Sequence, residues 1–299
     1  MIKKIFGHVK EIQLLQKLDI TKLPSSLILS GEKGIGKFLL AEEFSKYWLT
    51  NKTDQLKDNF LNNIFTLNST EIDRLNIQGV RNLIREMSLS SINDLEKFFI
   101  IDDFDSLNIN SKNALLKNLE EPPENSKIIL ISHKYETLLK TIKSRCININ
   151  LTSLSNDDFE KFLINKEPDI NKEEKEKLIY LCNGRPGLYD VIRKTNWLVV
   201  SKKINKIISY EEINYEKIFE IFDVYKKETI YLDFLIKKQL YDLSMQKLLK
   251  NKSQLELYKN IVKFINFISQ EVETNININL KNYFLSIFIS YFKLVKKFR

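Results

Sequence analysis

The sequence predicts an α/β protein in which a mostly parallel sheet is followed by an all-helical C-terminal part. Two observations carry this prediction. Through residues 1–150, short apolar runs alternate with helical patterns, which is typical of a parallel sheet covered by helices on both faces. After residue 151 the pattern turns helical throughout. The 299 residues correspond to about two domains, at roughly 100 to 200 residues each.

The elements of the first 150 residues follow from their apolar spacing. Residues 5–18 carry apolar side chains at helical intervals, and Pro24 breaks the chain before the apolar run 27–29. Further helices are expected at 37–49, around the apolar stripe 80–87, and at 110–121, where two prolines follow. The remaining expected strands are 64–67, 98–101, 128–131 and 146–151. The unbroken apolar runs among them predict strands buried on both faces.

The second half of the chain is expected to be helical. Short helices are predicted at 155–165, 171–182 and 186–195, with a turn at 183–187. Longer helices follow from about residue 200, where two apolar faces stand out. We therefore expect a core at 1–150, a small helical domain at 151–199 and a helical C-terminal domain at 200–299. The two faces contain Leu232, Leu235, Ile236, Leu240 and Leu243, and Leu257, Ile261, Ile265 and Ile268.

Composition narrows the class of protein. Hydrophobic residues make up 43% of the chain and charged residues 29%, which fits a globular protein and argues against a disordered or collagen-like one. The most apolar window, 283–295, is interrupted by polar residues and is too short for a membrane helix. The N-terminus lacks an apolar signal core. Cys146 and Cys182 are too few for a disulfide framework or a four-cysteine zinc site, so a cytoplasmic location is expected.

The net charge of +8 is unevenly distributed. Residues 1–200 carry 29 basic and 28 acidic side chains, whereas residues 201–299 carry 18 and 11, a net charge of +7. Such an excess is compatible with DNA contact, because lysines that neutralise phosphates release counterions. These lysines are spread over several helices and form no arginine-rich tract. Solvated helix faces are therefore the favoured interpretation, and a DNA-binding scaffold is the alternative.

Residues 31–38 read GEKGIGKF, which is the phosphate-loop pattern with Gly31, Gly36 and Lys37 in register. Only seven residues of the chain are glycine, and Gly34 is a third within this loop. Glycines let backbone N–H groups converge on phosphate oxygens, and the lysine reaches the terminal phosphates. The alternative is a glycine-rich turn that binds nothing, but the preceding strand and following helix favour a phosphate loop.

The last position of this pattern departs from a working site. It should be Ser or Thr, whose hydroxyl coordinates Mg²⁺, and it is Phe38. A phenyl ring offers no ligand and more bulk. We therefore expect hydrolysis on this loop to be impaired, and weak ATP binding without turnover stays open.

Asp102 and Asp103 follow the expected strand 98–101 in the Walker B arrangement. Asp102 would hold Mg²⁺ through water. Asp103 occupies the place where hydrolysing relatives usually carry the glutamate that orients the attacking water, and it is shorter. The alternative is a pair of capping aspartates after a core strand.

Three segments make the resemblance to a known family specific. Residues 113–123 read NALLKNLEEPP, a strand ends at Ser132, and residues 138–146 read LLKTIKSRC. In this order and spacing they resemble the AAA+ clamp-loader family, in particular delta-prime subunits of bacterial DNA polymerase III. The resemblance covers residues 1 to about 195. It implies an AAA+ P-loop core with a parallel sheet, followed by a small helical lid and an all-α C-terminal collar domain used in oligomerisation.

The resemblance also implies roles for single residues. Arg145, in the Ser-Arg-Cys motif at 144–146, corresponds to an arginine finger that points into the ATP site of a neighbouring motor subunit; taken alone, it would be an ordinary surface arginine. Ser132 corresponds to the residue that senses the γ-phosphate. In the turn 183–187, NGRPG, Gly187 stands where hydrolysing relatives carry an arginine, and Arg185 lies two residues earlier.

The implied function is support of sliding-clamp loading in DNA replication, with the chain's own ATPase lost. The implied partners are tau/gamma-like and delta-like subunits, with the sliding clamp and primed DNA within the complex. No metal or other cofactor is expected; in particular, residues 38–101 contain no cysteine for the zinc module that many relatives carry. The alternative within the family is an active, tau/gamma-like ATPase motor subunit.

Overall fold

The computed structural model describes residues 5–17, 24–52, 62–67, 77–89, 96–209, 214–224, 229–250, 259–264, 266 and 280–296. The chain forms two compact units, residues 1–187 and 188–299, which are described separately below. The first unit holds the sheet, the helices that cover it and the two short helices that come next in the chain. The expected three-domain division at 150/151 and 199/200 stays a prediction.

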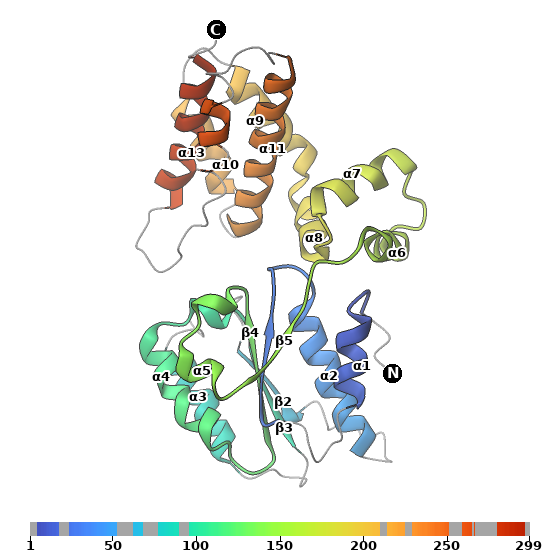
Figure 1. Ribbon diagram of the computed structural model, residues 1–299, viewed down its shortest axis with the longest axis vertical. Coiled ribbons are helices and arrows are strands. Elements are labelled where there is room, and N and C mark those ends of the chain that lie inside the picture. Colours follow the sequence, from blue (N-terminus) through green and yellow to red (C-terminus); the bar gives the residue numbers. More distant parts are fainter. Residues whose placement is uncertain are drawn as a thin grey trace. The chain divides into compact units, whose positions relative to one another are not determined.

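The first unit is built on a parallel sheet with the strand order β2-β3-β4-β1-β5 (Figure 1). β1 pairs with β4 so that Ser30 lies opposite Ser132, which brings the ends of these strands to one edge. The predicted strands and the predicted α/β class with a parallel sheet are confirmed. The strands are β1 Ser26–Ser30, β2 Ile64–Leu67, β3 Lys97–Ile101, β4 Ser126–Ser132 and β5 Ile147–Asn150.

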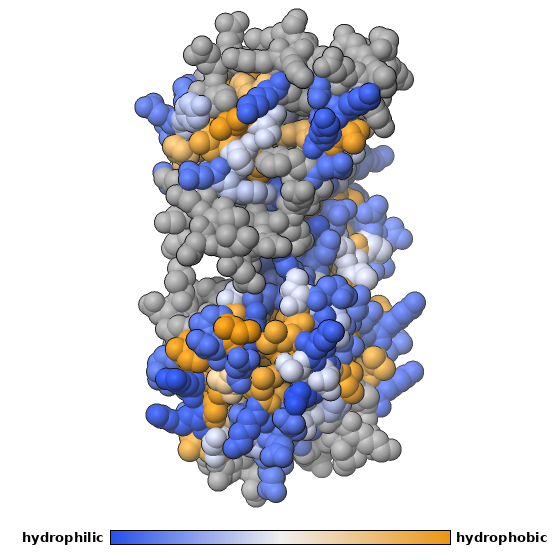
Figure 2. Space-filling view, turned by 60° about the vertical axis from the view of Figure 1, so that its left-hand side comes forward, coloured by the Kyte–Doolittle hydropathy of each residue, from blue (hydrophilic) through white to orange (hydrophobic). Residues whose placement is uncertain are grey.

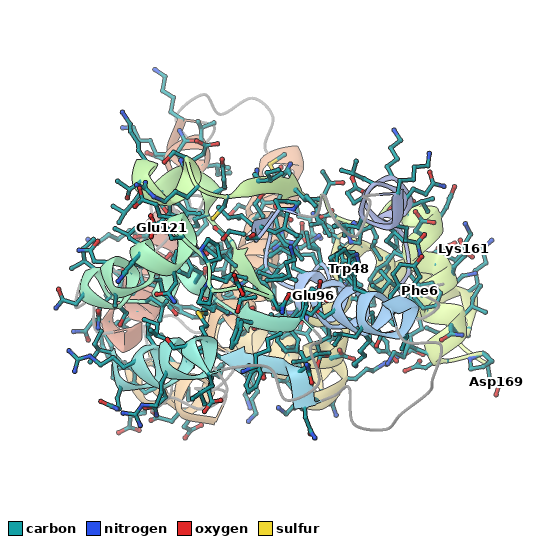
Figure 3. The ribbon with its side chains drawn as sticks, turned by 90° about the horizontal axis from the view of Figure 1, so that it is seen from below. Phe6, Trp48, Glu96, Glu121, Lys161 and Asp169 are labelled. Carbon is teal, nitrogen blue, oxygen red and sulfur yellow. The ribbon has the colours of Figure 1, made fainter. Side chains whose placement is uncertain are left out.

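Helices cover both faces of the sheet, and each face has its own apolar core. Because side chains alternate along a strand, Leu27 and Phe98 point to one core and Ile28 and Phe99 to the other. On the first face, the Trp48 ring (labelled in Figure 3) meets Phe98 edge-on at 6.0 Å. That face is covered by α1 (Val9–Lys17) and α2 (Lys37–Lys52), and the other by α3 (Ile77–Ser88), α4 (Ile109–Glu120) and α5 (Lys140–Lys143).

The first helix starts later than its apolar spacing predicts. It begins at Val9, because Gly7 and His8 both have the left-handed backbone conformation, with φ of 67° and 52°. A Cβ at Gly7 would lie 2.4 Å from a methyl group of Leu154. The preceding Phe6 packs edge-on against Phe162 instead of extending the helix (Figure 3). The predicted helix over residues 5–8 is therefore wrong.

Three helices predicted after residue 151 are confirmed to within one residue. They are α6 (Asn156–Lys166), α7 (Lys172–Cys182) and α8 (Pro186–Thr195). The side chains of Ser155 and Asn171 accept hydrogen bonds from backbone N–H groups of the first turns of α6 and α7, as N-caps do. Asn183, in the left-handed conformation, ends α7 and opens the turn that leads to α8.

The second unit is helical in its described part, as predicted. It contains α9 (Trp197–Ser209), α10 (Tyr215–Val224), α11 (Thr229–Lys250), a helical segment at 259–264 and α13 (Leu280–Lys296). Leu235, Ile236, Leu240 and Ile261 of the predicted apolar faces are buried. Leu257, Ile265 and Ile268 lie outside the described residues. No helix in the described ranges is long and apolar enough to cross a membrane.

Candidate functional site

The phosphate loop connects the end of β1 to the start of α2, as its sequence pattern requires. Gly31, Gly34 and Gly36 have φ of 133°, 88° and 99°, which side chains rarely allow. A Cβ at Gly31 would also lie 2.2 Å from the carbonyl oxygen of Leu151. The three glycines are therefore explained by the backbone of this loop. Function at the loop depends on the residues around it.

Two carbonyl groups of the loop are contacted by residues from elsewhere in the first unit. The Gly34 carbonyl accepts the Gly187 N–H at 2.8 Å, and His8 Nε2 lies 3.0 Å from the Ile35 carbonyl. Residues 33–34 form a hydrogen-bonded turn. N–H groups just before a helix N-terminus favour an anion, so phosphate binding at this loop stays a prediction.

Lys37, the lysine expected to reach the terminal phosphates, is folded back onto its own loop. Its Nζ donates to the carbonyls of Gly31 at 2.5 Å and Glu32 at 2.6 Å, and the residue is 3% exposed. Burial lowers the pKa of Lys37 from 10.5 to about 8, although Asp102 and Asp105 favour its charged form. A phosphate group would therefore have to draw the ammonium away from two carbonyls.

Phe38 fills the position of the Mg²⁺-binding hydroxyl with an aromatic ring. The ring packs against the apolar core formed by β1, β3 and α2. A Mg²⁺ ion in a nucleotide site takes only one or two ligands from the protein, and waters and phosphates supply the others. Phe38 lacks the oxygen that the Ser or Thr of a hydrolysing relative would contribute.

Asp102 and Asp103 lie at the end of β3, as predicted, but both carboxylates have protein partners. Asp102 accepts the backbone N–H of Asp103 at 2.9 Å, and burial raises the pKa of Asp102. Asp103 has the left-handed conformation, with φ of 48°, and pairs with Lys33 at 3.4 Å. Asp103 stands at the N-cap position of the 3₁₀ helix that follows, but its side chain makes no capping hydrogen bond.

Ser132, the expected sensor of the γ-phosphate, is turned towards Asp105. Its hydroxyl donates to Asp105 Oδ1 at 2.8 Å, and the backbone N–H of His133 donates to Asp105 Oδ2. Asp105 lies in the 3₁₀ helix η3 (Phe104–Ser106) and was not predicted as a site residue. Its place three residues after Asp102, in an acidic run, is the signal that would have found it.

The turn before α8 is joined to the phosphate loop by a hydrogen bond and an ion pair. Besides the Gly187–Gly34 hydrogen bond, Arg185 Nε lies 2.9 Å from Glu32 Oε2, and Ser153 donates to the same carboxylate oxygen at 2.9 Å. Glu32 was not singled out by sequence reasoning, because it occupies a variable position of the phosphate-loop pattern. Arg185 therefore contacts the loop itself from two residues before the usual position of a nucleotide-sensing arginine.

Arg145 lies far along the chain from the phosphate loop, between α5 and β5. Its guanidinium group makes an ion pair with Glu120 of α4, with 3.0 Å between Nη2 and Oε1, and donates through Nη1 to the Thr141 carbonyl at 2.9 Å. The Arg145 side chain is 28% exposed. The next residue, Cys146, packs on the core of the α3–α5 face, and burial raises the pKa of its thiol to about 12. The thiol is therefore protonated at neutral pH.

Comparison with known proteins identifies related sequences. Residues 8–155 match the family described as DNA polymerase III, delta subunit. The chain is 31% identical over 173 residues to the DNA polymerase III gamma subunit of Buchnera aphidicola from Schizaphis graminum, covering 54% of this chain and 47% of that protein. It is 29% identical over 172 residues to the delta-prime subunit of Pseudomonas aeruginosa, covering 53% and 52%.

A third relative aligns over a longer range. The delta-prime subunit of Buchnera aphidicola from Baizongia pistaciae is 23% identical over 232 residues, which cover 70% of this chain and 68% of that protein. By contrast, the chain spans about half of the length of the gamma subunit and of the Pseudomonas delta-prime subunit. Among solved structures, a gamma-subunit-related protein of Thermotoga maritima aligns with a TM-score of 0.46 and 19% identity, covering 96% of this chain and 99% of that one.

The matched residues 8–155 contain the phosphate loop, the Walker B strand and the Ser-Arg-Cys motif, so the comparisons and the sequence motifs refer to the same part of the molecule. The relatives carry different subunit names, gamma and delta-prime, within one polymerase assembly. The chain therefore resembles the delta-prime, gamma and tau subunits of bacterial DNA polymerase III.

Proposed function

We propose that this chain is a delta-prime-type subunit of a DNA polymerase III clamp loader, one that does not hydrolyse ATP itself. In this role it supplies Arg145 to the ATP site of a neighbouring motor subunit while the complex opens a sliding clamp and loads it onto primed DNA. Residues 1–150 would be the AAA+ core, 151–199 the lid and 200–299 the collar. Its partners would be tau/gamma-like and delta-like subunits.

The state of the chain's own phosphate loop carries this proposal. Phe38 replaces the Mg²⁺ ligand with a ring that packs on the core. The Lys37 ammonium group donates its hydrogen bonds to two carbonyls of its own loop. Phosphoryl transfer depends on a bound metal ion and a lysine that neutralise the charge of the transferred group. This loop lacks the Mg²⁺ ligand, and its lysine is engaged elsewhere. Both features support a subunit that binds nucleotide weakly and does not hydrolyse it.

The position of Arg145 supports the second half of the proposal. The guanidinium is partly exposed at the surface of the first unit. An arginine that approaches the γ-phosphate from another subunit stabilises the charge of the transition state, and in GTPases it accelerates hydrolysis by roughly 10³- to 10⁵-fold. Such a contribution would make the chain necessary to a neighbour's reaction.

Substitution of Arg145 tests the proposal. In the loader reconstituted from this chain and its sister subunits, Arg145→Ala should leave assembly intact and remove the share of DNA- and clamp-stimulated ATPase that the neighbouring site contributes. Arg85→Ala is the matched control, because Arg85 is an exposed arginine of α3 in the same unit. An ATPase rate equal to that of the control would refute the arginine-finger mechanism.

The second candidate is an ATPase motor subunit of the gamma or tau type. The 31% identity to a gamma subunit favours it, and so do the three positive-φ glycines, which suit the backbone of a phosphate-binding loop. The two candidate functions predict different ATP turnover by the isolated chain. We expect no MgATP turnover above that of the Lys37→Ala variant, measured by phosphate release. Turnover that Lys37→Ala abolishes would establish the motor subunit.

A further inference from the structure

Arg145 is held inside its own subunit by a carboxylate. Its Nη2 lies 3.0 Å from Oε1 of Glu120, the last residue of α4. We propose that Glu120 is a positioning residue that holds Arg145 at rest and gives it up to the triphosphate of the neighbouring subunit. The inference rests on the proposed function, because it assigns a resting state to the arginine finger.

The hydrogen bonds of the Arg145 guanidinium show which contacts must break before it can bind a phosphate group. Nη2 serves Glu120, and Nη1 donates to the Thr141 carbonyl at 2.9 Å and lies 3.4 Å from the Ser144 hydroxyl. Nε is buried and has no hydrogen-bond partner within the described residues. An arginine binds a phosphate best through two parallel N–H groups. These contacts use three of the four N–H bonds of the two terminal nitrogens, so a paired contact with phosphate oxygens requires Arg145 to give up at least one partner. Glu120 is the partner with which a phosphate competes by charge.

Glu120 does not stabilise the helix on which it stands. A helix C-terminus carries partial negative charge, so a carboxylate there is disfavoured unless a cation lies nearby. Arg145 is that cation. Glu121, which directly follows, is exposed and makes no ion pair with a described residue. Removal of the Glu120 charge should therefore leave the fold of α4 unharmed, which makes Glu120 suitable for substitution.

The ion pair between Arg145 and Glu120 is weak enough for another anion to replace Glu120. The side chains of Arg145 and Glu120 are 28% and 59% exposed, and solvent screens the attraction between them. Pairs with such exposure change an equilibrium by up to about fivefold. The γ-phosphate of ATP carries more negative charge than one carboxylate and is reached in a less solvated interface, so it should displace Glu120 from Arg145.

The competition has a kinetic signature. If the γ-phosphate already attracts Arg145 in the ATP-bound state, the cost of leaving Glu120 falls on ATP binding rather than on the chemical step. Loss of the Glu120 charge should then lower the KM for ATP by about two- to fivefold and leave kcat unchanged. If Glu120 had a purely structural role, its substitution would leave Arg145 poorly placed and would lower kcat.

The experiment compares Glu120→Gln with Glu121→Gln in the reconstituted loader. Both variants remove one charge at neighbouring positions (Glu121 is labelled in Figure 3), but only the first removes the partner of Arg145. ATPase is measured against ATP concentration, and the analysis uses the component of the rate that Arg145→Ala removes. We expect a KM reduced about two- to fivefold for Glu120→Gln alone. An unchanged or raised KM, or a reduced kcat, would overturn the proposal.

Two further measurements separate the possible failures. Glu120→Gln should have no effect in the Arg145→Ala background, and an effect that persists there would contradict a role through Arg145. If Arg145→Ala itself leaves the ATPase unchanged, the proposed function fails. If Arg145→Ala lowers the ATPase and Glu120→Gln behaves like Glu121→Gln, only this inference fails. Glu120→Ala repeats the comparison if the glutamine variant assembles poorly.

Discussion

His133 is a largely buried histidine, with 16% of its side chain exposed, and its surroundings keep it neutral. It follows Ser132 at the end of β4, and its Nδ1 is buried without a hydrogen-bond partner in the described part of the chain. Burial lowers the pKa of His133 from 6.5 to about 2, and the positive charges of Lys37 and Lys33 add to this. Asp103 lies 3.8 Å from Nε2 but is itself paired with Lys33, so it offers the imidazolium little support.

This environment predicts a loss of stability in acid. Between its ordinary pKa of 6.5 and about 2, the unfolded chain takes up a proton at His133 and the folded chain does not, so the free energy of unfolding falls as the pH falls through this range. By about pH 5 the loss from this one group is on the order of 2 kcal/mol relative to neutral pH. The His133→Leu variant should lack this component.

Urea unfolding at neutral pH and at about pH 5 measures the difference. The stability of the wild-type chain should fall by more than that of His133→Leu. At neutral pH, where His133 is uncharged in both states, the comparison reports only the packing change caused by the substitution. Equal losses in acid for the two proteins would show that His133 takes up its proton in the folded state.

At the scale of elements, the sequence predicts the strands better than the contacts between their ends. Unbroken apolar runs place β1, β3 and β4, because such runs suit strands buried on both faces. Apolar spacing alone misplaces the start of α1. The left-handed turn at Gly7 and His8 depends on packing against Leu154, which is remote in sequence. Local periodicity does not contain that contact.

The candidate site shows the same division between pattern and contact. The phosphate-loop pattern locates Gly31, Gly36 and Lys37 and exposes the anomaly at Phe38. It does not predict that Lys37 bonds its own loop, because this depends on the path of the backbone. Nor does it predict the ion pair between Arg185 and Glu32, which joins two segments about 150 residues apart. Partners that are distant in sequence need the fold before they can be named.

For the whole molecule, the sequence alone does not decide whether the excess positive charge forms a DNA-binding surface or lies on separate solvated helix faces. Residues 201–299 carry a net charge of +7, and those described lie on separate helices. Hydrophilic and hydrophobic residues are interleaved on the visible face of the second unit in Figure 2. Some lysines there have acidic partners, as Lys237 has in Asp233 at 2.8 Å. This arrangement favours solvated helix faces over a continuous track for a phosphate backbone.

The 299-residue chain on its own should therefore bind duplex DNA only weakly. We expect a Kd no tighter than roughly 10⁻⁵ M near physiological salt, which is within the range of non-specific binding. Fluorescence anisotropy at low and near-physiological salt measures it, and the double variant Lys202→Glu/Lys203→Glu, on the exposed face of α9, should bind as the wild type does. A submicromolar Kd that weakens steeply with salt and is lost in the double variant would instead assign this helix to DNA, since each phosphate contact adds to the salt dependence.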